Sequence, residues 1–394
     1  MSYNILSLDG GGSWAILQAM ALKEIYKGKS TKEILGEFDM VAANSGGSLM
    51  LACMIEFDTM DQVIEMFLLE ENRRDVFSEL GFFEKSIFEE IAVLLKSGPQ
   101  YKAERKLEGI EKALPKYGKQ LFTGLSEKLG LTTKFLVVAY DYDLQRAVYF
   151  SSDPKHFNGN IYENTLAQTV HASSNAPIKY FDEPAVFKYK GDLHRYWDGA
   201  MGGNNNPALV AVVEAMGVYQ QKAEDIRVLS LGTGNVILPI EGFTKFTSDF
   251  DFLIAEKEEQ SLKKDIVKMS NCILSEPMDA ATYMSHIVLG GGLMSDNLSN
   301  IVRLNPLIQP FLHANKWVLP SDFDEDKFKV LIDLEMDAVK QDEVKLIVEL
   351  GEKWIANKII NQAIRCDSEN LQPVLGHSTF ASAANYWKQI SIKP

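Results

Sequence analysis

A serine set among small residues has the surroundings of a nucleophile in this sequence. Ser45 stands in the run Ala43-Asn44-Ser45-Gly46-Gly47, which follows an apolar segment and leads into a helix of small residues. The run is a near match to the nucleophile elbow G-x-S-x-G, whose tight strand-to-helix turn exposes the serine hydroxyl at the positive end of a helix dipole. Ala43 stands where that motif has glycine. The alternative is a serine that only caps a helix in a small-residue turn.

Asp198 has the position of a base for such a serine. The segment RYWDGA (195–200) reads as a strand that ends at Asp198 and is followed by a turn. An aspartate with its usual pKa of about 3.9 is a weak base, so this role needs a desolvated site beside the hydroxyl. The alternative is an Asx turn, in which the carboxylate caps a loop. His194 is the rival base, but four residues of a strand span about 13 Å, so we interpret His194 as structural.

Three glycines after the first predicted strand form a candidate anion-binding loop. Asp9-Gly10-Gly11-Gly12 lies between NILSL (4–8) and a predicted helix, so its backbone N–H groups can approach a negative charge. One candidate anion is a dinucleotide pyrophosphate, because Gly10-x-Gly12-x-x-Ala15 fits the glycine fingerprint. That fingerprint also needs an acid at the end of a second strand, whereas Glu33 and Glu37 lie in a segment that reads as helix or turn. The other candidate is the oxyanion formed while an ester is cleaved.

Together, the three features resemble the signature of the patatin-like phospholipases, of the bacterial type. That signature is a D-G-G-G loop, a G-x-S-x-G elbow and a distant D-G-A/G, which this chain has in that order at 9–12, 43–47 and 198–200. HASSNAPIKYF (171–181) and VLSLGTG (228–234) also resemble segments of the family, so the resemblance covers roughly residues 4–240. Two positions depart from the pattern: Trp14 stands where the family usually has Arg or Lys, and Ala15 where it has Gly.

The resemblance implies a Ser–Asp dyad, with Ser45 as the nucleophile and Asp198 as the base. It implies an oxyanion hole made by the backbone N–H groups of Gly10, Gly11 and Gly12. It also implies that the elbow is supported by its small neighbours, which are Ala43, Gly46 and Gly47. On this reading no metal ion and no cofactor takes part in the reaction.

We therefore expect a lipid acyl hydrolase that cleaves fatty acyl esters of glycerophospholipids through an acyl-enzyme, with membrane phospholipid as its substrate. A broader lipid esterase or thioesterase is the alternative among enzymes. A second alternative is a catalytically weak protein that binds lipid or nucleotide on the same scaffold, because Trp14, Ala15 and Ala43 depart from the family pattern. The resemblance leaves open a small-molecule activator, the oligomeric state, and the head group, position and length of the acyl chain.

The predicted strands and helices that must position these residues fall into two regions, which divide near residue 240. Within 1–240, short β-type runs alternate with helical patterns, which predicts an α/β domain with a largely parallel sheet. The resemblance makes this a patatin-like three-layer α/β/α core. Residues 58–130 read as a helical insert and residues 241–394 as a mainly helical C-terminal region. Within the latter, 342–360 has apolar residues at helical spacing, which we interpret as core packing.

Composition narrows the class of protein further. The 394 residues carry a net charge of −14, which disfavours a broad nucleic-acid-binding surface. Cys53, Cys272 and Cys366 are odd in number and far apart, as expected for reduced thiols of a cytosolic protein. The N-terminus lacks a signal-peptide pattern, and no apolar run reaches the roughly 20 residues of a membrane span. We expect a cytoplasmic protein with transient contact at the inner face of the membrane.

Two charged segments each allow a functional and a structural interpretation. The segment 101–120 has six Lys/Arg against three Glu and follows an apolar helix predicted at 82–95. This pair suits an anionic membrane surface, or a helical cap with a solvated face. The acidic run 321–333 spaces Asp322, Asp324 and Asp326 like a calcium loop, but Lys327 stands where an EF-hand needs glycine. We interpret that run as a solvated acidic turn.

Overall fold

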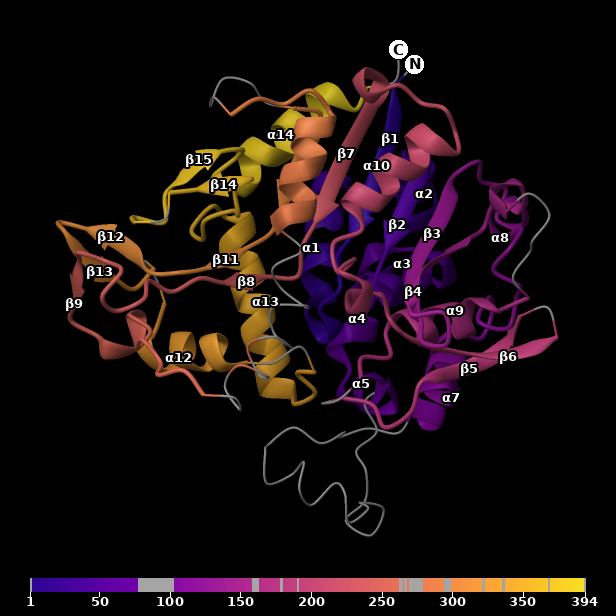
Figure 1. Ribbon diagram of the computed structural model, residues 1–394, viewed down its shortest axis with the longest axis horizontal. Coiled ribbons are helices and arrows are strands. Elements are labelled where there is room, and N and C mark those ends of the chain that lie inside the picture. Colours follow the sequence, from indigo (N-terminus) through magenta and orange to yellow (C-terminus); the bar gives the residue numbers. More distant parts are fainter. Residues whose placement is uncertain are drawn as a thin grey trace, which may run out of the picture.

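Helices cover both faces of a central sheet in the computed structural model, and the two chain termini lie close together (Figure 1). The structure describes residues 2–76, 103–157, 163–177, 180–189, 191–261, 265, 268, 279–293, 299–320, 323–334, 337–367 and 369–392.

The main sheet has eight strands, five of which run parallel. The strands are β1 (Tyr3–Leu8), β2 (Met40–Ala43), β3 (Lys134–Asp141), β4 (Arg146–Ser151), β5 (Ala185–Tyr189), β6 (Asp192–Asp198), β7 (Ile226–Leu231) and β10 (Ile301–Leu304). Their order is β10-β7-β1-β2-β3-β6-β5, and β4 also pairs with β3. The pairings from β10 to β3 are parallel, whereas β4, β5 and β6 pair antiparallel. The expected α/β fold with a largely parallel sheet is confirmed.

Several of the helices begin directly after a capping residue. The helices are α1 (Ile16–Ile25), α2 (Thr31–Gly36), α3 (Gly46–Glu56), α4 (Met60–Leu68), α5 (Glu70–Val76), α7 (Ala103–Ala113), α8 (Leu125–Lys128), α9 (Leu166–Ser173), α10 (Ala208–Gly217), α12 (Glu325–Asp333), α13 (Gln341–Ile355) and α14 (Phe380–Ile390). Ser30, Thr59 and Thr165 each form a capping box, which satisfies free backbone N–H groups at the start of α2, α4 and α9.

Short elements complete the chain. The 3-10 turns are η1 (Gly12–Ala15), η2 (Pro154–Phe157), η3 (Gly199–Gly202), η4 (Ala223–Asp225) and η5 (Asp251–Leu253). The small sheets contain β8 (Asn235–Val236), β9 (Thr247–Ser248), β11 (Leu307–Ile308), β12 (Phe311–His313), β13 (Lys316–Val318), β14 (Arg365–Cys366) and β15 (Pro373–Leu375). They pair as β11-β8, β12-β13-β9 and β14-β15.

Alternate residues of the parallel strands face two different apolar layers. Leu6, Val41 and Val137 belong to the core layer that also contains the buried residues of α1 and α3. Ile5, Ala42 and Leu136 belong to the layer formed with α10 on the opposite face. Because successive side chains of a strand point to opposite faces, strands buried on both faces read as continuous apolar runs. The layers are therefore helix, sheet and helix.

The C-terminal region packs directly on this core. Its strand β10 pairs with β7 at the edge of the main sheet, while α13 packs against α1 and α14 against β10. Val344, Ile347 and Trp354 of the predicted apolar stripe are fully buried, which confirms their interpretation as core. The helix itself ends at Ile355, before the predicted end of the stripe.

In the helical insert, α7 lies at the carboxyl ends of the parallel strands, whereas α8 lies beside the start of β3. The described parts of the insert contain α4, α5, α7 and α8, and α5 packs beside α7 at the lower edge of Figure 1. The apolar helix predicted at 82–95 lies outside the described residues. Across the described ranges, we find no helix with both the length and the apolar character needed to cross a membrane.

Candidate active site

Ser45 lies on a strained turn between β2 and α3. Its backbone has φ 51° and ψ −122°, a combination that residues with a side chain rarely adopt. The N–H of Ser45 donates to Ser173 Oγ at 3.0 Å, and Ser48 Oγ donates to the Ser45 carbonyl oxygen at 2.6 Å. These bonds hold the turn in place, and strain of this kind is often found at functional sites.

The glycines after Ser45 allow the elbow to touch the glycine loop. A Cβ at Gly46 would lie 2.6 Å from the backbone nitrogen of Gly12, and one at Gly47 would lie 2.3 Å from the carbonyl oxygen of Leu8. Both distances are too short for any side chain. Ala43, by contrast, is fully buried in the core, so its extra methyl fits.

The register of β3 brings Asp198 to Ser45. Ala43, the last residue of β2, pairs with Val137, and Asp198, the last residue of β6, pairs with Ala139. Because β4 occupies the other edge of β3, β2 and β6 must share one edge and meet end to end. The residues that follow the two strands therefore lie together at the centre of the sheet.

The Asp198 carboxylate is buried and has several hydrogen-bond donors. Its side chain accepts hydrogen bonds from Asn44 Nδ2 at 3.1 Å and from the Ala200 N–H at 2.9 Å, and it lines the same cavity as Ser45. Burial raises the pKa of Asp198, and these donors together with the charge of Lys106 oppose that rise. A carboxylate with a raised pKa accepts a proton more readily than a solvated one.

The glycine loop faces the elbow, and part of its backbone is already engaged. Gly11 and Gly12 have φ values of 156° and 55°, which favour glycine. The N–H of Gly10 donates to the Asn205 carbonyl oxygen at 2.9 Å, and Thr233 Oγ1 donates to the Gly10 carbonyl oxygen at 2.7 Å. Gly10 thus anchors the loop with the N–H that was expected to face the oxyanion.

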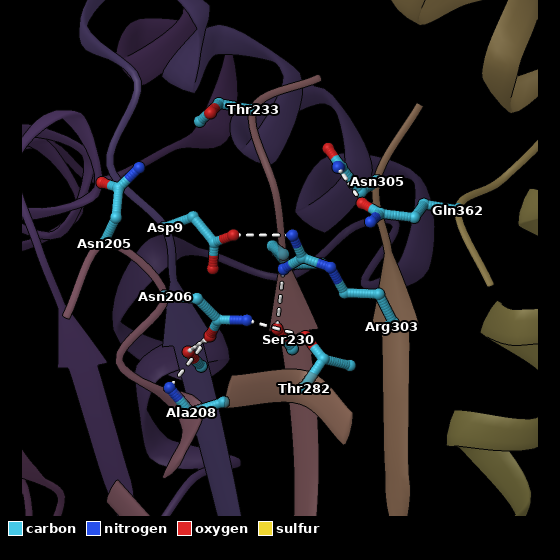
Figure 2. Close-up of polar contacts among 12 residues, drawn as sticks. Asp9, Asn205, Asn206, Ala208, Ser230, Thr233, Thr282, Arg303, Asn305 and Gln362 are labelled. Carbon is cyan, nitrogen blue, oxygen red and sulfur yellow. Dashed lines mark hydrogen bonds and ion pairs between the residues drawn. The ribbon is translucent and has the colours of Figure 1, made fainter. Parts of the chain in front are cut away.

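A buried ion pair fixes the start of this loop (Figure 2). Arg303 Nη2 lies 2.7 Å from Asp9 Oδ2, and Arg303 Nη1 donates to Ser230 Oγ at 2.8 Å. Burial raises the pKa of Asp9 from 3.8 to about 6, although Arg303 lowers it. Sequence reasoning missed Arg303, whose only signal is a charge inside the apolar run of β10.

Two cavities adjoin each other at Gly12 and Leu49, and one of them contains the elbow. One, of about 30 Å³, is lined by Ser45, Asp198, Lys106, Gly12 and Leu49, among others. The second, of about 60 Å³, shares Gly12 and Leu49 with it, and apolar residues form most of its remaining wall: Ala52, Cys53, Met66, Phe67, Ile110, Ala113 and Leu114. The site therefore combines a polar centre with an adjoining apolar space.

Lys106 corrects one sequence interpretation. It was counted with the basic segment 101–120 as a surface charge, but its side chain is buried and lines the cavity of Ser45 and Asp198. Arg105 and Lys112 of the same helix are exposed, as expected for a solvated face. Lys106 lies on the inner face of α7, which the amphipathic pattern of the segment did not reveal.

The remaining candidates lie apart from this centre. His194 Nδ1 lies 3.2 Å from Asp141 Oδ2 on β3, consistent with its structural interpretation. Asp324 caps α12 by accepting from the N–H of Asp326 at 2.9 Å. Within the part of the chain that the structure describes, no group of three or more His, Cys, Asp or Glu is arranged to hold a metal ion. Trp14 is buried in the core beside Gly234.

Comparison with known proteins defines the class to which this fold and site belong. The family model of the patatin-like phospholipases matches residues 6–212, more than half of the chain. The chain therefore belongs to the patatin-like phospholipase family, which at the family level is associated with lipid acyl hydrolysis. The crystal structure of VipD from Legionella pneumophila aligns over 89% of this chain and 67% of that one, with 10% identity and a TM-score of 0.36. No curated protein matches the sequence.

Proposed function

We propose that this chain cleaves fatty acyl esters of glycerophospholipids, with Ser45 as the nucleophile and Asp198 as the base. The observation that carries the proposal is that Ser45, on its strained turn, lines the same cavity as the buried carboxylate of Asp198. A serine on a strained turn whose hydroxyl shares a cavity with a desolvated carboxylate is well arranged to lose its proton as it attacks.

In the proposed acylation step, Ser45 Oγ bonds to the ester carbonyl carbon while its proton passes to Asp198. The carbonyl π electrons become the oxyanion lone pair. When the carbonyl re-forms, the bond to the alcohol oxygen breaks, and Asp198 returns the proton to that oxygen. Water then repeats the sequence on the acyl-enzyme and releases the fatty acid. Ser45, Asp198 and water balance every proton and electron, so the proposal involves no metal ion or cofactor.

The proposed oxyanion hole is formed by the N–H groups of Gly11 and Gly12, because the Gly10 N–H already has an acceptor within the chain. The start of α3 adds the positive end of a helix dipole behind Ser45. Fixed donors of this kind typically lower the barrier by about 3–4 kcal/mol each.

The apolar cavity supports a lipid acyl chain as the substrate group. It adjoins the glycine loop through Gly12 and Leu49, so a chain lying there would leave its carbonyl near Ser45. The remaining part of a phospholipid lies in a bilayer. An anionic bilayer repels this chain overall, because the chain carries a net charge of −14. We therefore propose transient contact at the inner membrane face through the exposed cations of α7.

The test compares hydrolysis and covalent labelling in three variants. Ser45→Ala and Asp198→Asn should each reduce ester hydrolysis to background, and Ser45→Ala should also lose labelling by a fluorophosphonate probe. His194→Ala is the control and should keep most of its activity, because His194 faces Asp141. Labelling that survives in Ser45→Ala, or turnover that depends on His194 in place of Asp198, would contradict the dyad.

A further inference from the structure

A lysine is buried beside the proposed base. Lys106 lies on α7 with its side chain only 1% exposed, and it lines the same cavity as Ser45 and Asp198. Lysine is rarely buried without a partner, because removing an ammonium from water is costly. Something in this site must therefore compensate that charge.

The immediate neighbours of Lys106 stabilise the ammonium form. Its Nζ donates to the carbonyl oxygen of Ser174 and lies 4.0 Å from the centre of the Phe181 ring, within cation–π range. Burial lowers the pKa of Lys106 well below its usual value, and the negative charge of Asp198 opposes that shift. One carbonyl and one ring leave a net positive charge, which a carboxylate can balance.

The other charged groups around this cavity are less suited to that role. His171 of α9 is buried, and burial together with the charge of Lys106 lowers its pKa, so its positive form is disfavoured beside Lys106. Arg73 of α5 is itself a cation, lines the adjoining apolar cavity, and donates to the carbonyl oxygens of Val339 and Phe67 and to Gln341. Asp337 also lines the cavity but is only half-buried, so water partly screens its charge, whereas Asp198 is shielded from water. Asp198 is the fully buried carboxylate of the cavity wall.

We propose that Lys106 is a positioning residue for Asp198, whose ammonium keeps the carboxylate ionised and ready to accept the Ser45 proton. The inference rests on the proposed dyad and adds a third member from the helical insert. Two opposite charges buried at one cavity stabilise each other, whereas either one alone would be an uncompensated charge.

The first consequence is a change in pH dependence. Without the ammonium, the ionised form of Asp198 loses a favourable interaction, so the pKa of Asp198 rises further. A base must be unprotonated to act, so the acidic limb of the pH–rate profile must move to higher pH. A structural role for Lys106 would lower the rate by the same factor at every pH.

The first experiment measures kcat/KM for a short, water-soluble ester against pH. Lys106→Met should shift the acidic limb upward by about one pH unit or more, which is a loss of about tenfold on that limb. Lys106→Arg should keep the limb near its original position because it keeps the charge. Lys128→Met, an exposed lysine on α8, is the matched control and should leave the profile unchanged. An unshifted limb in Lys106→Met would overturn the inference.

The second experiment does not depend on activity. Urea unfolding is measured for Lys106→Met, Asp198→Asn and the double variant. Each single variant leaves one buried charge without its partner, so the double variant should be destabilised by less than the sum of the two. If Lys106→Met fails to fold but the double variant folds, that result also shows that the two charges interact. Additive losses would show that the two charges do not interact.

These outcomes separate this inference from the proposed function. If Ser45→Ala and Asp198→Asn are inactive but the Lys106→Met limb is unshifted and the losses are additive, the dyad stands and Lys106 has no such role. If Ser45→Ala remains active, the dyad fails, while the unfolding experiment still reports whether Lys106 and Asp198 interact.

Discussion

At the scale of single residues, the catalytic geometry depends on positions without a side chain. Ser45 approaches the glycine loop only because Gly46 and Gly47 let two backbone segments touch. The proposed oxyanion donors belong to the same contact, so a single added methyl would change the distance between Ser45 and these donors. The elbow is therefore more sensitive to size than to polarity.

Gly46→Ala should lower ester hydrolysis roughly hundredfold or more, the usual cost of losing an oxyanion donor. Its new Cβ would lie 2.6 Å from Gly12 N, so the glycine loop must move away from Ser45. Gly217→Ala at the end of α10 is the control, since its Cβ would meet nothing within 4 Å. Rates are compared on a soluble ester, with circular dichroism as a check of folding. Equal rates for both variants would mean that this contact does not position the hole.

At the scale of elements, β3 acts as the template of the site. Its one edge carries the end of β2 and the end of β6, which arrive from opposite directions. The loops after both strands must then meet, whatever their separation in sequence. Strand β7 pairs with the other edge of β1, and β10 pairs with β7, which places Arg303 of β10 within reach of Asp9 in the glycine loop. The C-terminal region therefore contributes to a site whose motifs all lie before residue 240.

Arg303→Met should destabilise the fold by about 3–5 kcal/mol at neutral pH, because it leaves the buried Asp9 carboxylate without its partner. The loss should be smaller in mild acid. The pKa of Asp9 is about 6 in the folded chain and 3.8 ordinarily, so the folded chain binds this proton more tightly than the unfolded chain does. The free energy of unfolding therefore falls as the pH rises between these two values. Without Arg303 the folded pKa rises further and this window extends upward.

Urea unfolding at mildly acidic and at neutral pH measures this effect. Arg303→Lys keeps the charge and should lose less stability than Arg303→Met. Arg227→Met, which removes a partly exposed arginine of β7, is the matched control and should cost little at either pH. A loss in Arg303→Met that is the same at both pH values would contradict the role assigned to Asp9.

At the scale of the whole molecule, charge is unevenly placed. The chain carries −14 overall, yet α7, which lies beside α5 at the lower edge of Figure 1, carries the exposed cations Arg105 and Lys112. An acidic protein that reaches an anionic bilayer needs such a local patch to set its orientation. Lys106 is not part of this patch, because its side chain points into the core.

Arg105→Glu together with Lys112→Glu should weaken binding to anionic liposomes by about tenfold or more, since each cation contributes roughly 1 kcal/mol. Turnover of a water-soluble ester should be unchanged, because both residues are exposed and outside the cavities. Lys27→Glu with Lys222→Glu is the control, with the same charge change after α1 and before β7, at the opposite end of the sheet. Liposome co-sedimentation measures binding. If both pairs weaken it equally, net charge alone is responsible.

The sequence by itself determined the features that depend on local steric limits and on the spacing of apolar residues. Small residues around Ser45, glycines after Asp9 and the D-G-A run at Asp198 predicted the motifs, and apolar runs predicted the α/β class. These signals are readable because a tight turn or a buried strand restricts the residue types within a few positions. The catalytic roles of Ser45 and Asp198 remain predictions.

Only the tertiary structure decided which distant residues complete the site. Arg303 lies 294 positions from Asp9, and the Asn205 carbonyl that occupies the Gly10 N–H is also remote. No local pattern encodes such pairs, because they arise from the register of strands that are far apart in the chain. Lys106 was misplaced for a related reason: on an amphipathic helix a lysine reads as solvated, and only the packing of α7 against α9 turns this one toward the buried carboxylate of Asp198.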